Sequence, residues 1–158
     1  MGDKKITVAL VGNPNSGKTT IFNNLTGSRQ HVGNYPGVTV EKKEGYRHFK
    51  ENNFLIVDLP GTYSLTAYSL EEVVTRNFIV NDKPDMVVDI LDASNLERNL
   101  YLTVQLLELE RPTILALNMI DVANASGLKV DDGKLSKCLG GIPVTRTIGV
   151  NNSGMEDL

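Results

Sequence analysis

Residues 12–19 read Gly-Asn-Pro-Asn-Ser-Gly-Lys-Thr, and this stretch decides the fold. It follows an apolar run at residues 6–11 and leads into a helix-forming run at residues 20–25. A strand, a glycine-containing loop and a helix in this order form a cradle for nucleoside triphosphates. The glycines let the loop bend so that backbone N–H groups and the positive end of the helix converge on phosphate oxygens. We therefore predict a nucleotide site here.

Two side chains of this loop have separate predicted tasks. Lys18 is expected to reach the β- and γ-phosphates, and the Thr19 hydroxyl is expected to ligate Mg²⁺. The alternative is a chance match to this short pattern in a surface loop. The strand before the loop and the helix after it disfavour that alternative.

The composition indicates one soluble domain of ordinary size. The chain has 158 residues and a net charge of −3, with basic side chains scattered among acidic ones, so nucleic acid is not an expected partner. The single cysteine, Cys138, excludes an internal disulfide and suits a reducing compartment. No apolar run approaches the ~20 residues of a membrane span. Because residues 154–158 resemble the first turn of a helix, we expect domain 1–158 to be truncated before its last helix.

Further apolar, β-branched runs alternate with helical patterns along the chain. These runs lie at residues 54–57, 86–91, 113–117 and 142–144. Such alternation favours an α/β fold with a mostly parallel sheet and helices on both faces. We predict a sheet of six strands.

The pattern between the strands predicts two helices and one mobile loop. One helix is predicted at residues 96–110, and another at residues 69–81, where Ser69 and Glu72 have the spacing of a capping box. Residues 27–45 predict a loop until about Val38, because residues 33–37 are rich in chain-bending types.

The sequence Asp58-Leu59-Pro60-Gly61 follows the second apolar run, at the sheet edge where ligands bind in α/β folds. Asp58 is expected to hold Mg²⁺ through water, and the Gly61 N–H is expected to approach a γ-phosphate. Thr39, in the mobile loop, is expected to complete the Mg²⁺ shell when that phosphate is present. A plain Pro-Gly turn and an ordinary strand threonine are the alternatives.

The sequence Asn118-Met119-Ile120-Asp121 ends the run at residues 113–117 and predicts guanine recognition. The Asp121 carboxylate can accept two N–H bonds from guanine, whereas adenine would leave it unpaired, so GTP is expected rather than ATP. Met119 stands where many GTPases have lysine, which predicts weaker affinity with the same base preference. GTPases usually contact the guanine oxygen through a backbone N–H in a Ser-Ala pair. Residues 147–150 depart from that pattern, and we place the Gly149 N–H at this contact. A loose loop there would give fast GDP release.

Residues 12–27, 32–45 and 92–103 together resemble the N-terminal GTP-binding domain of the ferrous iron transport protein B family, FeoB. The resemblance implies a Ras-like P-loop GTPase fold. It also implies a GTPase domain at the cytoplasmic face of the cell membrane that regulates or drives Fe²⁺ uptake by a permease. It implies GTP and GDP as ligands, helical and membrane domains beyond residue 158 as partners, and a homo-oligomer as a further candidate. His31, His48 and Cys138 are too few and too dispersed to indicate an iron site here.

Two positions bear on the hydrolysis rate. Thr62 stands where Ras-type GTPases place a water-orienting glutamine, so slow hydrolysis is expected. Asn15 resembles the asparagine that holds K⁺ against the phosphates in potassium-activated GTPases, where the ion stabilises developing charge. Simple loop hydrogen bonding is the alternative role for Asn15.

The sequence thus predicts a GTP-binding, slowly hydrolysing switch domain. A docking module with negligible turnover and a soluble Era-like GTPase of ribosome or tRNA maturation stay open as alternatives; the latter would need a basic RNA-binding appendix. The predicted catalytic residues are Asn15, Lys18, Thr39 and Gly61. The predicted metal ligands are Thr19, Thr39 and Asp58 for Mg²⁺ and Asn15 for K⁺. The predicted nucleotide contacts are Gly12, Asn13, Pro14, Asn15, Ser16, Gly17, Lys18, Thr19, Thr20, Gly37, Val38, Thr39, Asp58, Leu59, Pro60, Gly61, Asn118, Met119, Asp121, Ile148, Gly149 and Val150.

Overall fold

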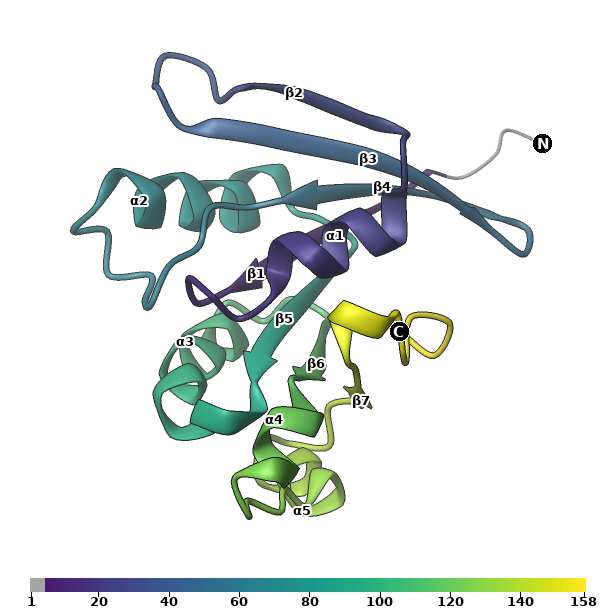
Figure 1. Cartoon of the computed structure of the whole chain (residues 1–158). Coiled ribbons are helices and arrows are strands. Elements are labelled where there is room, and N and C mark those ends of the chain that lie inside the picture. Colours follow the sequence, from purple (N-terminus) through teal and green to yellow (C-terminus); the bar gives the residue numbers. More distant parts are fainter. Residues whose placement is uncertain (1–4) are drawn as a thin grey trace.

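The computed structural model describes residues 5–158, in which seven strands form one sheet in the order β2-β3-β4-β1-β5-β6-β7 (Figure 1). Strands β4, β1, β5, β6 and β7 are parallel, and β2 and β3 are antiparallel to their neighbours. The predicted α/β fold with a mostly parallel sheet is confirmed. The strands are β1 (Lys5–Gly12), β2 (Gln30–Asn34), β3 (Glu41–Phe49), β4 (Asn52–Asp58), β5 (Met86–Asp92), β6 (Thr113–Asn118) and β7 (Val144–Arg146).

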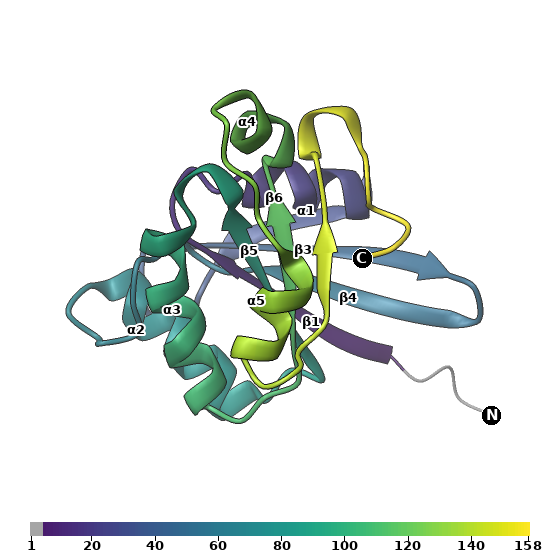
Figure 2. The same ribbon diagram turned by 90° about the horizontal axis from the view of Figure 1, so that it is seen from below.

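Helices cover both faces of this sheet (Figure 2). Helix α1 packs with the C-terminal residues on one face, and α2, α3 and α5 lie on the other. Helix α2 continues into a π-helical turn at Phe78–Asp82. None of the described helices is long and apolar enough to cross a membrane. The helices are α1 (Lys18–Thr26), α2 (Leu70–Asn77), α3 (Leu96–Glu108), α4 (Ile120–Ala125) and α5 (Asp132–Cys138).

The alternation along β1 divides the core into its two layers. Ala9 and Val11 point to the layer that contains α2 and α3, whereas Val8 and Leu10 point to the layer that contains α1. All four side chains are buried, as expected for a central parallel strand covered on both sides. This rigid strand ends at the loop that begins the predicted nucleotide site.

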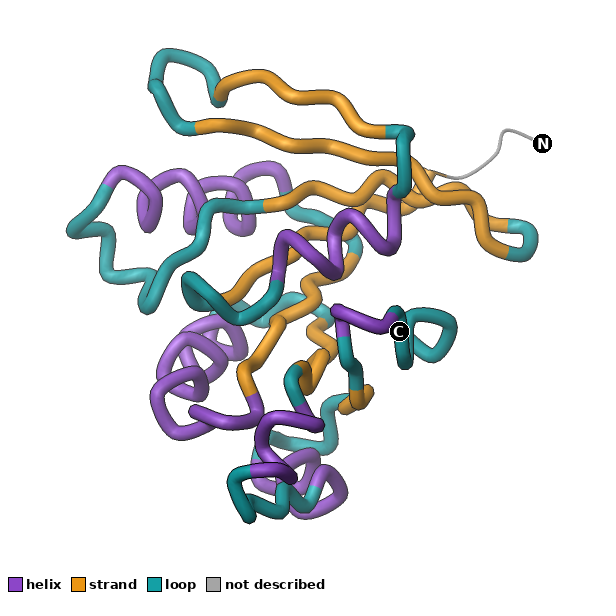
Figure 3. Tube along the Cα trace, in the orientation of Figure 1, coloured by secondary structure: helices purple, strands orange, loops and turns teal. Residues whose placement is uncertain are grey.

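The predicted strand count was wrong by one, because β2 lies in the predicted loop at residues 27–45. Its five residues pair antiparallel with β3, from Gln30 opposite Gly45 to Asn34 opposite Glu41 (Figure 3). All five are exposed, so no hydrophobic alternation marks the strand in the sequence. Backbone pairing with β3 forms this strand without burial. At the other edge, β7 begins at Val144, two residues later than the predicted run.

Both predicted helices form, but the end of one and the buried side of the other differ from the prediction. The Ser69 Oγ accepts a hydrogen bond from the Glu72 N–H at 3.1 Å, which confirms the cap, although α2 itself ends before residue 81. In α3 the buried side is formed by Asn99, Leu102, Thr103 and Leu106. Leu96, Leu100, Val104 and Leu107 repeat at helical spacing in the sequence, yet Val104 is 49% exposed. Polar Asn99 and Thr103 therefore occupy core positions that a hydrophobic pattern cannot identify.

Candidate nucleotide-binding site

The loop between β1 and α1 has a backbone that requires glycine at two points. Gly17 has a φ of 87°, and a Cβ there would overlap the Asn118 amide. A Cβ on Gly12 would lie 2.7 Å from the Ile90 carbonyl oxygen. Asn15 also has a positive φ, at 65°, a conformation that asparagine tolerates better than most residues. The loop thus curls tightly in front of the first turn of α1.

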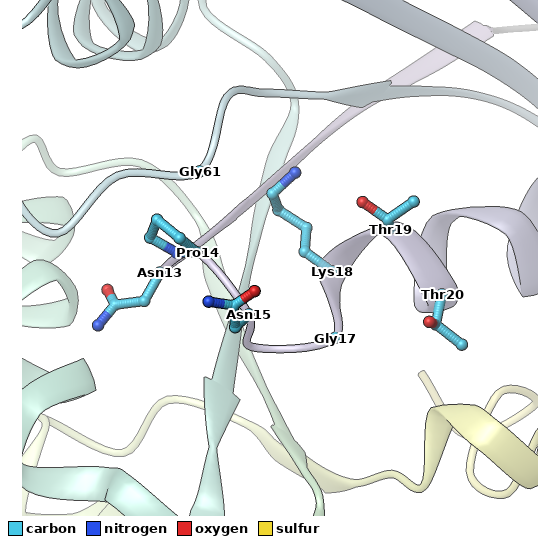
Figure 4. Close-up of a pocket in the computed structure, with 8 residues that line it drawn as sticks. All are labelled: Asn13, Pro14, Asn15, Gly17, Lys18, Thr19, Thr20 and Gly61. Carbon is cyan, nitrogen blue, oxygen red and sulfur yellow. The ribbon is translucent and has the colours of Figure 1, made fainter.

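This loop forms the floor of an open cavity of about 400 Å³ (Figure 4). The volume falls within the range of small-molecule sites. The amino end of α1 borders it, so unpaired N–H groups and the helix dipole favour an anion there. The lining residues are Asn13, Pro14, Asn15, Gly17, Lys18, Thr19, Thr20 and Gly61. Of the predicted loop contacts, Gly12 and Ser16 are buried behind this lining.

Gly61 reaches the cavity from the end of β4. A Cβ on this residue would lie 3.3 Å from the Pro14 N and Cα, so the two loops touch (Figure 4). The next residue, Thr62, is buried, and its N–H donates to the Gly12 carbonyl oxygen at 3.1 Å. Its side chain does not line the cavity. The position that carries glutamine in Ras-type GTPases therefore offers no group to the cavity.

Lys18 and Asp58 form a buried ion pair between the loop and the end of β4. Each is less than a tenth exposed, so each neutralises the other in a poorly solvated place. A second cavity of about 180 Å³ adjoins them, and Leu59 and Pro60 contribute to its lining. The sequence did not predict the other lining residues, which are Val40, Glu41 and Lys43.

Two side chains here carry oxygen atoms of the kind that Mg²⁺ binds. The Asp58 carboxylate and the exposed Thr19 hydroxyl at the start of α1 supply oxygen ligands, which Mg²⁺ prefers together with phosphate oxygens and water. Among residues 5–158, no group of three or more His, Cys, Asp or Glu side chains could hold a metal ion. The two protein oxygens are therefore a partial set that a phosphate chain and water would complete.

Thr39 lies in a loop that reaches the second cavity only at its last residue, Val40. Thr39 is exposed, and Gly37, Val38 and Thr39 line neither cavity. The loop is anchored at Tyr35, whose N–H donates to the Val40 carbonyl oxygen at 3.0 Å and whose side chain packs in the core. Burial raises the pKa of the Tyr35 hydroxyl. The structure thus does not bring Thr39 to the other predicted Mg²⁺ ligands.

A smaller, mostly apolar cavity of about 130 Å³ shares Gly17 and Thr20 with the first. The residues predicted to recognise guanine line this cavity. Val122 belongs to it and was not predicted, although it directly follows the predicted aspartate. The remaining lining residues are Asn118, Met119, Asp121, Ile148, Gly149 and Val150.

Asn118 connects three segments around this cavity. Its Nδ2 donates to the Ser16 carbonyl oxygen at 2.9 Å. Its Oδ1 accepts from the Gly149 N–H at 3.0 Å and from the Thr147 hydroxyl at 3.2 Å. The Gly149 N–H, predicted to contact the guanine oxygen, thus bonds to a protein side chain. Asp121 is exposed in the first turn of α4, with its carboxylate available to a ligand.

The family profile described as "Ferrous iron transport protein B" matches residues 6–158. The chain belongs to this family. It is 51% identical to the Fe(2+) transporter FeoB of Escherichia coli K12 over 159 residues, which cover 98% of this chain and 20% of that protein. The chain thus spans about a fifth of the length of the curated relatives that it matches.

Solved FeoB structures share the fold closely. The FeoB G-domain of Methanococcus jannaschii is 47% identical with a TM-score of 0.87, and the match covers 98% of this chain and 92% of that one. The cytosolic domain of Thermotoga maritima FeoB, in a GDP form, is 45% identical with a TM-score of 0.94, and the match covers 98% and 60% of the two chains. The Ras-like P-loop GTPase fold predicted from the sequence is therefore confirmed.

Proposed function

We propose that this domain binds GTP together with Mg²⁺ and hydrolyses it slowly, as a nucleotide switch. The observation that carries the proposal is the pair of cavities that meet at Gly17 and Thr20. The first is bordered by the loop between β1 and α1, by Lys18 and by the amino end of α1, and these groups suit a phosphate chain. The other is apolar, with Asp121 at its edge, which suits a purine base.

In the proposed complex, Lys18 leaves Asp58 and contacts the β- and γ-phosphates, while Asp58 and Thr19 hold Mg²⁺. When bound, Mg²⁺ supplies positive charge to the β- and γ-phosphate oxygens. The Gly61 N–H binds a γ-phosphate oxygen, and the loop at residues 37–39 moves to bring Thr39 to the site. Hydrolysis is slow because the chain places no glutamine or other polar side chain from position 62 in the cavity.

K⁺ is the proposed activator of this reaction, with Asn15 as its ligand. Asn15 is exposed and lines the phosphate cavity. An ion there would lie beside the β- and γ-phosphates, where positive charge stabilises the transition state. This role would compensate in part for the absent glutamine.

The decisive experiment measures GTP hydrolysis in KCl and in NaCl for the wild type and for Asn15→Ala. A switch that turns over is faster in KCl, and Asn15→Ala removes the difference while GDP affinity stays the same. Slow hydrolysis that is equal in both salts would instead favour a docking module, in which nucleotide binding recruits a partner without appreciable turnover. A wild-type protein that does not bind GTP would reject both functions.

In the whole protein, we propose that this domain regulates or drives Fe²⁺ uptake from the cytoplasmic face of the cell membrane. Membership of the ferrous iron transport protein B family supports this role over an Era-like GTPase of RNA maturation. Its partners would be the helical and membrane domains of the same protein, and a homo-oligomer is a further candidate. Measuring ⁵⁵Fe²⁺ uptake by cells that carry full-length protein with Lys18→Ala tests the link, since uptake should fall with nucleotide binding.

A further inference from the structure

The loop that follows Gly61 is attached to α3 at two points. The Arg98 guanidinium carbon lies 4.4 Å from the centroid of the Tyr63 ring, which is a cation–π contact. The Leu65 N–H donates to the Gln105 Oε1 at 2.7 Å. Arg98 and Gln105 are seven residues apart, so they lie two turns apart on the same side of α3. One side of α3 therefore contacts Tyr63 and Leu65, two alternate residues of the loop.

The start of α3 is itself fixed to the ligand edge of the sheet. The Asp92 Oδ1, at the end of β5, accepts hydrogen bonds from the Ser94 N–H at 2.8 Å and the Ser94 Oγ at 2.6 Å. The Asn99 side chain accepts from the Asp92 N–H at 3.2 Å and donates to the Asn95 carbonyl oxygen at 2.9 Å. These hydrogen bonds fix the start of α3, which carries Arg98.

The stretch 92–103 carries part of the family resemblance, yet none of its residues lines the phosphate or base cavities. Within it, Arg98 contacts Tyr63 in the loop after Gly61. Helices α2 and α3 lie on the same side of the sheet, and the loop joins β4 to α2 beside them (Figures 1 and 2). The stretch is therefore placed to act on the nucleotide site through this loop.

A shift of Tyr63 would be transmitted to Gly61, two residues earlier. Gly61 already touches Pro14, and Thr62 is bonded to the Gly12 carbonyl oxygen, so this short segment is held from both ends. The Gly61 N–H must lie within hydrogen-bond distance of a γ-phosphate oxygen to stabilise its charge. Small errors in such positions lower reaction rates steeply.

We propose that Arg98, together with Gln105, is a positioning residue for GTP hydrolysis: it holds Tyr63 so that Gly61 faces the γ-phosphate. The inference rests on the proposed GTPase function. Arg98 is exposed and lies outside the phosphate cavity, so it acts through the loop and not on the nucleotide. An exposed cation–π contact has a strength that corresponds to about a two- to fivefold change in rate.

The test compares hydrolysis and nucleotide affinity among matched variants in KCl. Arg98→Ala should lower kcat about two- to fivefold while KM for GTP and the Kd for GDP stay unchanged. Arg98→Lys should recover part of the loss, because an ammonium keeps the charge but not the planar stack. Glu97→Ala, at the exposed neighbouring position of α3, is the control and should have the wild-type rate.

A double-mutant cycle shows whether Arg98 acts through Tyr63. Tyr63→Ala should have the same kcat as Arg98→Ala, and the double variant should lose no more than either single variant. Tyr63→Phe keeps the ring face and should recover the wild-type rate. Losses that multiply in the double variant would overturn the inference, as would wild-type kcat in Arg98→Ala.

Gln105→Ala provides a second measurement that does not depend on the cation–π contact. Hydrogen exchange at the Leu65 amide should become faster, because its acceptor is removed, and kcat should fall. Faster exchange with unchanged kcat would overturn the positioning role while leaving the proposed function intact. If the wild type itself binds GTP but does not hydrolyse it, the proposed GTPase activity fails, and this inference fails with it.

Discussion

Replacing Asp89 by asparagine should strongly change the pH dependence of stability. Asp89 is on β5, is fully buried, and faces α3, where the Thr103 hydroxyl donates to its Oδ2 at 2.6 Å. Its Oδ1 has no partner among the described residues. Burial raises the pKa of this carboxyl from 3.8 to about 7, and the Thr103 hydrogen bond offsets only part of that effect.

The sign of the effect follows from proton linkage. The folded state binds the Asp89 proton more tightly than the unfolded state does, so the stabilisation is complete below about pH 4 and is lost as pH rises to about 7. The two pKa values differ by about 3, and each unit corresponds to 1.36 kcal/mol. The loss in the free energy of unfolding is therefore on the order of 4 kcal/mol.

Urea unfolding followed by circular dichroism, at several values between about pH 4 and pH 8.5, measures this loss. The introduced amide would keep an acceptor for Thr103 and would not ionise. The difference in unfolding free energy, Asp89→Asn minus wild type, should rise by roughly 4 kcal/mol across the range and then level off. Carboxylates outside the core, such as Glu72 and Asp132, cancel in this difference. Parallel stability curves for the two proteins would refute the reasoning.

The remaining predictions concern the site and one helix end. Lys18→Ala should abolish tight binding of GTP, measured by calorimetry, because it removes the phosphate contact and leaves Asp58 as a buried unpaired charge. Asp121→Asn should shift preference from GTP to xanthosine triphosphate, and an unchanged GTP affinity would reject the predicted base contact. Gly17→Ala should lower the melting temperature and prevent nucleotide binding, since its Cβ would meet the Asn118 amide. Ser69→Ala should destabilise the domain by about 1 kcal/mol in chemical unfolding, because the Glu72 N–H loses its cap.

The sequence predicted best the parts of the fold in which burial controls residue type. Strand β5 is recognisable because its neighbours on both sides and its two covering layers demand apolar residues. Strand β2 has no such signature, because no side chain in Gln30–Asn34 is buried. Helix α5 was not predicted, because it has no buried residue that would mark a hydrophobic pattern. Its local signal is the Asp131 side chain, which accepts from the Lys134 N–H at 2.9 Å as a cap.

The candidate site follows the same division between local and distant information. Residues 12–19 lie together in sequence and in space, so their placement around one cavity was predictable. The contacts of Asn118 with Ser16 and Gly149 link positions far apart in the chain, and residue types alone do not specify them. The same is true of Arg98 and Tyr63. Thr39 differs again, since its predicted contact requires a rearrangement of a loop that is anchored elsewhere in this structure.

The buried pair of Lys18 and Asp58 has a consequence for how metal and nucleotide affect each other's binding. A triphosphate alone would take Lys18 and strand the carboxylate, and a divalent cation alone would take Asp58 and strand the ammonium, both in a dehydrated setting. Only the two together give each side chain a new counter-charge. In the proposed complex, metal and nucleotide would therefore strengthen each other's binding, so the domain would bind the metal-loaded nucleotide in preference to either component alone.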